Sequence, residues 1–356
     1  MVIASSIPTV NEEMEKEVIR ALREEFLVGG KSVEKFEGEF AEFIGVKYAV
    51  ALSSGTDALV IALRCLDIKG KVITPPMTFV ATAESIVLSG AEPKFADINK
   101  NTWNIDINEI KNQISKDVEA IMPVHLYGLP CEMDEIMRLA DENNLSIIED
   151  CAQCHGGEYK DRKVGSFGEI NCFSFYTTKN MTSGGNGGMI TTNDSDLADK
   201  AKLLREHGGG NESKYIGYNA RLNTINAAFA RVQLKYLNEW NERRQEIANI
   251  YFDELKDIED IILPINSKNH TYHLFCIEAD NRDGLKNHLR TKKIFCGIHY
   301  PIPVNRLSPY KKYVNKQYPI SENHAQKALS LPMYPTLNDG EVYLVCKSIK
   351  EFYGEK

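Results

Sequence analysis

The 356-residue sequence has no long apolar segment, no long run of like charges, no internal repeat and no low-complexity tract. No apolar run reaches the roughly 18 residues that a membrane-spanning helix needs, and residues 1–9 lack the basic stretch and apolar core of a secretory signal. The 42 basic and 50 acidic residues give a net charge of -8. This balance argues against nucleic acid or an anionic membrane as the main partner. We therefore expect a cytoplasmic protein.

The eight cysteines are scattered along a chain much larger than a disulfide-stabilised mini-domain, so reduced thiols are expected. Residues 151–155 match the C-x-x-C-H pattern of covalent haem attachment. We reject that interpretation and a zinc or redox pair, because zinc would need a second ligand pair nearby. No metal is expected. The G-x-G-x-x-G pattern of dinucleotide binding is absent after the early strands, so nicotinamide binding has no support.

Apolar runs typical of buried strands alternate with segments of helical length and composition. This alternation indicates an α/β fold with a mostly parallel sheet flanked by helices. The expected strands lie at residues 48–52, 71–73, 94–96, 120–124, 146–148, 173–175 and 189–192. A long helical stretch at 226–252 leads into a smaller α+β unit. We place the boundary near residue 240, giving a large domain at 1–240 and a small C-terminal domain at 241–356.

A four-residue repeat near the N-terminus predicts an amphipathic helix. Met14, Val18, Leu22 and Phe26 would all lie on one face of that helix. Packing against the core accounts for such a face, and we expect no further role for it.

Lys179 follows an apolar strand and precedes a glycine-rich turn at 184–188. A lysine amine held at such a place suggests carbonyl chemistry through a Schiff base. An ordinary solvated loop lysine is the alternative, and the functional interpretation depends on other segments that point the same way.

Two further segments place polar groups where strands end. In residues 53–59 a strand gives way to a helix whose free N–H groups would bind a phosphate, although an ordinary helix cap with a glycine in the turn fits as well. Residues 147–153 end a hydrophobic strand in carboxylates. Ligands of open α/β sheets bind at the C-terminal ends of strands, so Asp150 is well placed for chemistry.

Pyridoxal 5'-phosphate (PLP) unites these features, because it needs a lysine, a carboxylate for its pyridine nitrogen, a phosphate cup and an aromatic lid. The sequence resembles the DegT/StrS family of sugar-nucleotide aminotransferases over nearly its whole length. The segments that carry the resemblance are residues 53–56, 78–79, 149–153, 174–179 and 217–221, with further likeness at 123–128, 299–301 and 329–335.

The resemblance implies a fold-type I PLP transferase that forms a homodimer with its active sites at the interface. Lys179 would form the Schiff base with PLP. Asp150 would pair with the pyridinium nitrogen, Gln153 would bond the ring hydroxyl, and Phe79 would stack on the ring. The phosphate would be held by Ser54, Gly55, Thr56, Ser174 and Asn219 of the partner subunit.

The resemblance also implies a reaction. An amino acid, expected to be L-glutamate, would convert PLP to pyridoxamine 5'-phosphate, which would then aminate a nucleotide-linked keto-deoxysugar, with Lys179 as the acid/base. The product would be a precursor of a surface glycan or glycosylated metabolite. Candidate substrate contacts are His155, Arg221, His299 and Tyr300, although a lone histidine is as often structural.

Some positions depart from the family pattern. Cys151 and Cys154 stand where small residues are common, Asn186 replaces a frequent acidic residue, and Asn305 replaces a histidine in the region expected to contact substrate. The particular sugar is therefore not readable from the sequence.

Three other functions compete with sugar amination. Sugar 3-dehydratases of this fold carry a histidine in place of the lysine, so Lys179 argues against them. A synthase of aromatic amines retains the lysine. A regulatory protein could bind PLP without turnover, although no basic recognition helix supports nucleic-acid binding.

Overall fold

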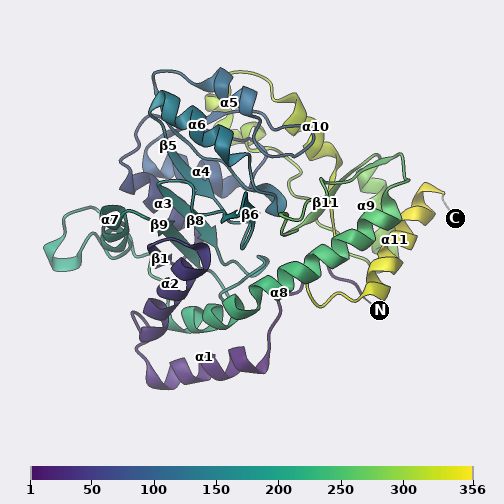
Figure 1. Ribbon diagram of the computed structural model, residues 1–356. Coiled ribbons are helices and arrows are strands. Elements are labelled where there is room, and N and C mark those ends of the chain that lie inside the picture. Colours follow the sequence, from purple (N-terminus) through teal and green to yellow (C-terminus); the bar gives the residue numbers. More distant parts are fainter. Residues whose placement is uncertain (1, 355–356) are drawn as a thin grey trace.

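The computed structural model describes residues 2–354, and its centre is a seven-stranded sheet in the order β1-β9-β8-β5-β4-β2-β3 (Figure 1). Six strands run in the same direction and β9 runs opposite to them. The strand bounds are β1 Tyr48–Leu52, β2 Lys71–Thr74, β3 Glu92–Phe95, β4 Val118–Ile121, β5 Ser146–Asp150, β8 Ile170–Ser174 and β9 Gly188–Thr192. The predicted mostly parallel sheet is confirmed, with small shifts at strand ends.

Helices cover both faces of this sheet, because successive strand residues point to opposite sides. Ile148 and Cys172 pack with α3, whereas their neighbours Ile147 and Phe173 belong to the apolar clusters of the opposite face. The helices of this unit are α1 Glu12–Glu24, α2 Lys31–Ile44, α3 Gly55–Cys65, α4 Val80–Ser89, α5 Ile107–Gln113, α6 Met133–Asn143 and α7 Ser195–Arg205. A short hairpin, β6 Glu158–Tyr159 and β7 Arg162–Lys163, follows β5.

A second apolar core lies around a three-stranded antiparallel sheet of β10, β11 and β12. Tyr251, Phe275 and Leu329 are fully buried in it. Ile3 also packs here and bridges to Ile294, so the N-terminal segment joins this unit. Its elements are β10 Ile261–Ile262, β11 Phe275–Ala279, α9 Arg282–Thr291, α10 Pro319–Lys327, β12 Ala328–Leu331 and α11 Asp339–Tyr353.

Helix α8, Thr224–Leu255, runs without interruption from the large sheet to the second core (Figure 1). Its first half packs on α1 and α2, and its last turns pack with α11. The predicted boundary near residue 240 falls in the middle of this helix and stays a prediction.

The apolar face of α1 is not fully covered by the core, and the expectation that core packing explains it is wrong. Met14 is buried against α8, but Leu22 is 49% exposed and Phe26 is 85% exposed. Leu27 and Val28 continue this exposed strip at about half exposure. The predicted helix is present but ends at Glu24, with extended backbone at Glu25, so Phe26 lies beyond it. The helical period alone also cannot tell a face that packs on the core from one that another surface covers.

Within residues 2–354, no helix combines the length and the apolar character needed to cross a membrane. The cytoplasmic location stays a prediction.

Asp97 ties the large sheet to the start of α10. Its carboxylate is 4% exposed and accepts hydrogen bonds from the amides of Ile320 and Ser321, both at 3.0 Å, and from the Ser321 hydroxyl. These amides belong to the first turn of α10, where helical N–H groups lack partners and negative charge is favourable.

We expect Asp97→Ala to lower the free energy of unfolding by about 3 kcal/mol, because it leaves several buried donors without an acceptor. Asp194→Ala is the matched control: the carboxylate of Asp194 caps α7 by accepting from the amides of Asp196 and Leu197 in its first turn, so its loss should cost about 1 kcal/mol. Urea denaturation of both variants measures the difference. Equal losses would show that Asp97 is an ordinary helix cap.

Candidate active site

A cavity of about 590 Å³ lies between the C-terminal edge of the large sheet and the second unit. Ten of the residues that the sequence singled out line it: Ser54, Gly55, Thr56, Phe79, Asp150, Gln153, Ser174, Lys179, His299 and Tyr300. They come from segments far apart in the sequence, which meet because parallel strands end at the same edge. Their roles toward a cofactor remain predictions.

Lys179 lies in the loop after β8, and its backbone amide donates to the carbonyl of Tyr176 at 2.9 Å. The side chain lines the cavity and is partly buried. Burial lowers the pKa of Lys179 to about 8, and the nearby Asp150 carboxylate opposes this shift. A substantial fraction of the amine is therefore neutral near pH 8, the form that attacks a carbonyl group.

Asp150 is the last residue of β5 and is 4% exposed. Burial raises the pKa of this carboxyl, while hydrogen bonds to its charged form and the positive charge of Lys179 oppose the rise. The hydroxyl of Thr82 donates to one oxygen at 2.8 Å, and the amide of Ala152 donates to the other at 3.1 Å. The hydroxyls of Thr82 and Thr78 lie 2.8 Å apart. Helix α4 thus holds the carboxylate in place.

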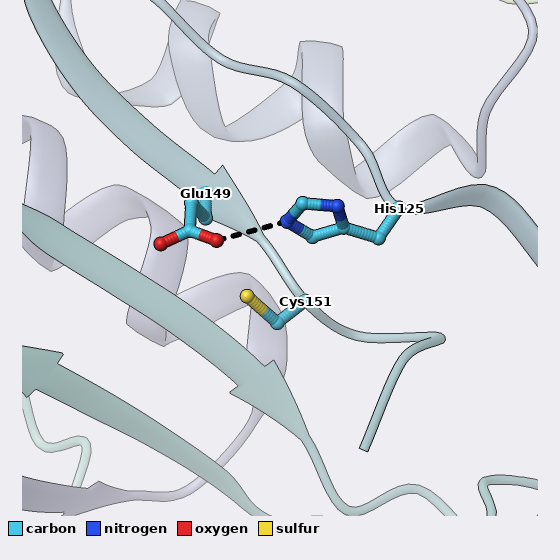
Figure 2. A group of neighbouring side chains, drawn as sticks. All are labelled: His125, Glu149 and Cys151. Carbon is cyan, nitrogen blue, oxygen red and sulfur yellow. Dashed lines mark hydrogen bonds and ion pairs between the residues drawn. The ribbon is translucent and has the colours of Figure 1, made fainter. Parts of the chain in front are cut away.

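A buried group of His125, Glu149 and Cys151 flanks Asp150 (Figure 2). The amide of Cys131 donates to His125 Nδ1 at 3.0 Å, so the other ring nitrogen carries the proton and donates to Glu149 at 3.0 Å. The Glu149 oxygens also accept three backbone N–H groups of the loop 165–168 at 2.7–3.0 Å. These contacts occupy the lone pairs of His125 and Glu149 that a metal would need. The group therefore stabilises the packing of β5 against its neighbouring loops.

The start of α3 faces the end of β8 at very close range. A methyl group added at Gly55 would lie 2.6 Å from Cβ of Ser174, so only glycine fits there. Ser54 caps the helix, its hydroxyl accepting from the amide of Asp57 at 3.0 Å. The first N–H groups of the helix have no partner within it and, with the hydroxyls of Thr56 and Ser174 beside them, form a cradle for an anion.

Gln153 joins the two units. Its carbonyl oxygen accepts from the amide of Tyr127 at 2.8 Å, and its nitrogen donates to the hydroxyl of Tyr300 at 2.9 Å. The rings of Tyr300 and Phe79 lie 5.8 Å apart at a tilt. Phe79 is 52% exposed, an unusual state for an aromatic side chain beside a cavity unless a flat group covers it.

The two candidate histidines have different surroundings. His299 lines the cavity, with Nδ1 2.9 Å from the hydroxyl of Ser330, and burial lowers its pKa to about 4. His155 is only 1% exposed, and its ring packs against Phe173 and Phe175 in the core. It is not among the residues that line the cavity, so the expected substrate contact of His155 is corrected: the residue follows the segment 149–153 closely in the chain, but its ring lies in the core.

Asn219 and Arg221 lie outside the cavity wall of this chain. Asn219 is exposed, and Arg221 donates to Glu206 at 2.8 Å and to Asn219 at 3.3 Å. Asn305 is buried next to Glu322, away from the cavity lining. The role predicted for Asn219 toward a partner subunit stays a prediction.

Sequence reasoning missed several residues of the cavity. Ser5 and Ser6 reach it because the N-terminal segment pairs with the second unit, and Thr82 and His273 reach it from α4 and from the segment before β11. Only Thr82 had a local signal, since it lies one helical turn after Thr78. The others depend on long-range packing.

Comparison with known proteins gives the same assignment over almost the whole chain. The model of the DegT/DnrJ/EryC1/StrS aminotransferase family matches residues 8–350. The chain is 37% identical to dTDP-3-amino-3,6-dideoxy-alpha-D-galactopyranose transaminase of Aneurinibacillus thermoaerophilus, covering 96% of this chain and 95% of the relative. It is 38% identical to GDP-perosamine synthase of Escherichia coli O157:H7, covering 92% of each.

A solved structure agrees with both the fold and the family. DesV of S. venezuelae, determined in complex with a ketimine intermediate, superposes with a TM-score of 0.93 at 33% identity, covering 97% of this chain and 95% of that one. The fold-type I architecture and the aminotransferase class predicted from the sequence are thereby confirmed. The chain belongs to the DegT/DnrJ/EryC1/StrS aminotransferase family.

Proposed function

We propose that this protein is a PLP-dependent aminotransferase that moves an amino group from L-glutamate to a nucleotide-linked keto-deoxysugar. The observation that carries the proposal is the meeting of Lys179 and Asp150 in one cavity with the cradle at the start of α3. A partly neutral amine, a buried carboxylate and an anion site are the three groups that PLP chemistry requires.

The residues present fit PLP in size and chemistry. Gly55 has no side chain, which lets the start of α3 approach Ser174 closely, and the donors gathered there suit a phosphate. Asp150 would hold a pyridinium nitrogen, and the exposed ring of Phe79 would cover a flat heterocycle. When bound, PLP supplies an electron sink that stabilises negative charge at the carbon losing a proton.

Lys179 would carry the proton transfers. An acid/base works best when its pKa lies near the working pH, and burial brings the pKa of Lys179 to about 8. Asp150 would keep its negative charge toward the cofactor, because Thr82 and Ala152 both donate to it. Gln153 would bond the ring hydroxyl, and its hydrogen bond to Tyr300 would link this contact to the second unit.

The proposed class of sugar substrate is inferred from the names of the relatives. Their names specify a dTDP-linked 3-amino-3,6-dideoxy sugar and GDP-perosamine, both nucleotide-linked amino sugars. We infer that this chain uses the same class, without assigning the nucleotide or the ring carbon.

A homodimer would complete the site. Asn219 is exposed beyond the cavity wall of its own chain, so its side chain is accessible to a neighbouring one. The exposed apolar strip of Leu22, Phe26, Leu27 and Val28 offers a surface that a second subunit would cover.

Lys179 also separates the alternatives. The sugar dehydratases of this fold carry histidine at that position, so amination is favoured over dehydration. An aromatic-amine synthase or a regulator that binds PLP would keep the lysine, and a relative that is 35% identical over 96% of this chain is named pleiotropic regulatory protein, of Geobacillus stearothermophilus. Cycling of the cofactor between its aldehyde and amine forms would distinguish amination from a regulator without turnover.

We expect Lys179→Ala to lose turnover by about a thousandfold or more, because one amine serves both cofactor attachment and proton transfer. Wild-type protein with PLP should lose its visible absorption band on addition of glutamate and release 2-oxoglutarate, whereas the variant should do neither. Lys160→Ala, which removes an exposed lysine paired with Asp134, is the control and should behave as wild type. Near-normal turnover of Lys179→Ala would refute the proposal.

Thr82→Val should weaken PLP binding about 10-fold or more, because the lost hydrogen bond supports the ionised form of Asp150. Thr82→Ser keeps the hydroxyl and should remain close to wild type. Equilibrium titration of the cofactor-free proteins with PLP measures both. If the valine variant binds as tightly as the serine variant, the hydroxyl is dispensable and only the shape of α4 matters.

The reaction of cofactor-free protein with PLP should depend on pH through Lys179. Only the neutral amine attacks the aldehyde, so the rate should rise with pH to a plateau with a midpoint at the lowered pKa of about 8. In Asp150→Asn the midpoint should move to lower pH, since a nearby negative charge that favours the cation is gone. Borohydride reduction followed by mass spectrometry quantifies the labelled lysine. A midpoint above about pH 10, the value of a free lysine, would contradict the burial argument.

A further inference from the structure

His273 lies in the cavity wall and has no role in the scheme above. It precedes β11, is 5% exposed, and comes from the second unit, opposite the loop of Lys179. Its Nδ1 is 3.2 Å from Oδ1 of Asn180, the residue that follows Lys179 in the chain.

A chain of hydrogen bonds fixes the direction of this contact. The amide nitrogen of Asn241 donates to the backbone carbonyl of His155 at 2.8 Å, which can only accept. Asn241 therefore turns its oxygen to the nitrogen of Asn180 at 2.9 Å, and that nitrogen also donates to the carbonyl of Thr271 at 2.9 Å. Asn180 is left with its oxygen toward His273.

The protonation of the His273 ring follows from this arrangement. Because an amide oxygen only accepts, Nδ1 carries the proton and Nε2 carries a lone pair. Nε2 has no hydrogen-bond partner among residues 2–354. Burial and the positive charges of Lys179 and Arg244 lower the pKa of His273 well below its ordinary value, so the ring stays neutral. The cavity wall thus presents an acceptor that cannot become a donor at ordinary pH.

A hydroxyl group fits this acceptor and a carboxylate does not. Glutamate would bring carboxylate oxygens, which accept hydrogen bonds and repel another lone pair, whereas a sugar brings hydroxyl donors. We propose that His273 is a specificity-determining residue for the amino-group acceptor, with Nε2 receiving a hydrogen bond from a hydroxyl of the sugar. This inference rests on the proposed function.

The test compares two half-reactions on the same PLP-loaded enzyme. Glutamate drives one of them. Because transamination is reversible, a nucleotide-linked amino sugar drives the other in the reverse direction, and dTDP-3-amino-3,6-dideoxy-α-D-galactose and GDP-perosamine, taken from the names of the relatives, are the probes. Stopped-flow absorbance follows the loss of the visible band in both.

Two variants test the roles of the two ring nitrogens of His273 separately. His273→Asn retains a donor near the Nδ1 position and has no atom at Nε2, so it should lower the second-order rate constant for the amino sugar about 10- to 100-fold. His273→Gln can place a carbonyl oxygen near the Nε2 position and should recover most of that loss. The glutamate half-reaction should change less than about twofold in both variants, because no hydrogen bond to glutamate is lost.

An equal loss in both half-reactions would overturn the proposal. It would mean that His273 acts by positioning Lys179 or by stabilising the fold. Unchanged rates for the amino sugar in both variants would overturn it as well. Failure of the proposed function itself gives a different result: wild-type enzyme would react with neither amino sugar.

A measurement without substrate tests the same inference. In protein labelled with ¹⁵N-histidine, Nε2 of His273 should show the chemical shift of an unprotonated ring nitrogen and Nδ1 that of a protonated one. The spectrum of His273→Gln assigns the signal by its absence. A protonated Nε2 would overturn the proposal whatever the kinetics show.

Discussion

The site depends on placing a partly buried amine and a buried carboxylate in one cavity at the same edge of a sheet. Burial alone drives both groups toward neutrality, lowering the pKa of Lys179 and raising that of Asp150. Their mutual attraction and the donors from Thr82 and Ala152 oppose that drive. The balance leaves an amine that can exchange protons near pH 8 and a carboxylate supported in its charged form, two properties that an exposed pair would not have together.

Such a balance requires rigid neighbours, and the fold provides them from two cores. Glu149, next to Asp150, is fixed by His125 and by three backbone amides. The far wall comes from the second unit, which Asp97 joins to the large sheet through the start of α10. The N-terminal segment places Ser5 beside the cavity, and the backbone carbonyl of Ser5 accepts a hydrogen bond from the amide of Met333. The cavity is therefore a property of how the two units meet, and neither core contains it alone.

The sequence predicted those parts of the site that lie at the ends of strands or in the turns that follow them. Asp150 ends β5 and Gly55 begins the helix after β1, so local pattern and position along the chain pointed to both. Ser174, which ends β8, was identified only through the family resemblance. Long-range packing was not readable in the same way. His155 and His273 are both histidines near apolar segments, yet one turns into the core and the other faces the cavity. Phe26 fitted the helical period in the sequence, yet it lies beyond the end of α1 and is exposed, and the period revealed neither fact.

The neutral state of the histidines has a consequence for an enzyme that must receive two different substrates in one cavity. An imidazolium at His273 would attract the carboxylates of an amino acid and hold them at the sugar position. Burial and the charge of Lys179 prevent that protonation, and Asn180 fixes which nitrogen accepts. Asn180, the residue after Lys179, thus determines that His273 presents a hydrogen-bond acceptor to the cavity. The chain next to Lys179 and the orientation of the His273 ring are therefore linked through Asn180, so a change at Asn180 would alter the acceptor that His273 presents.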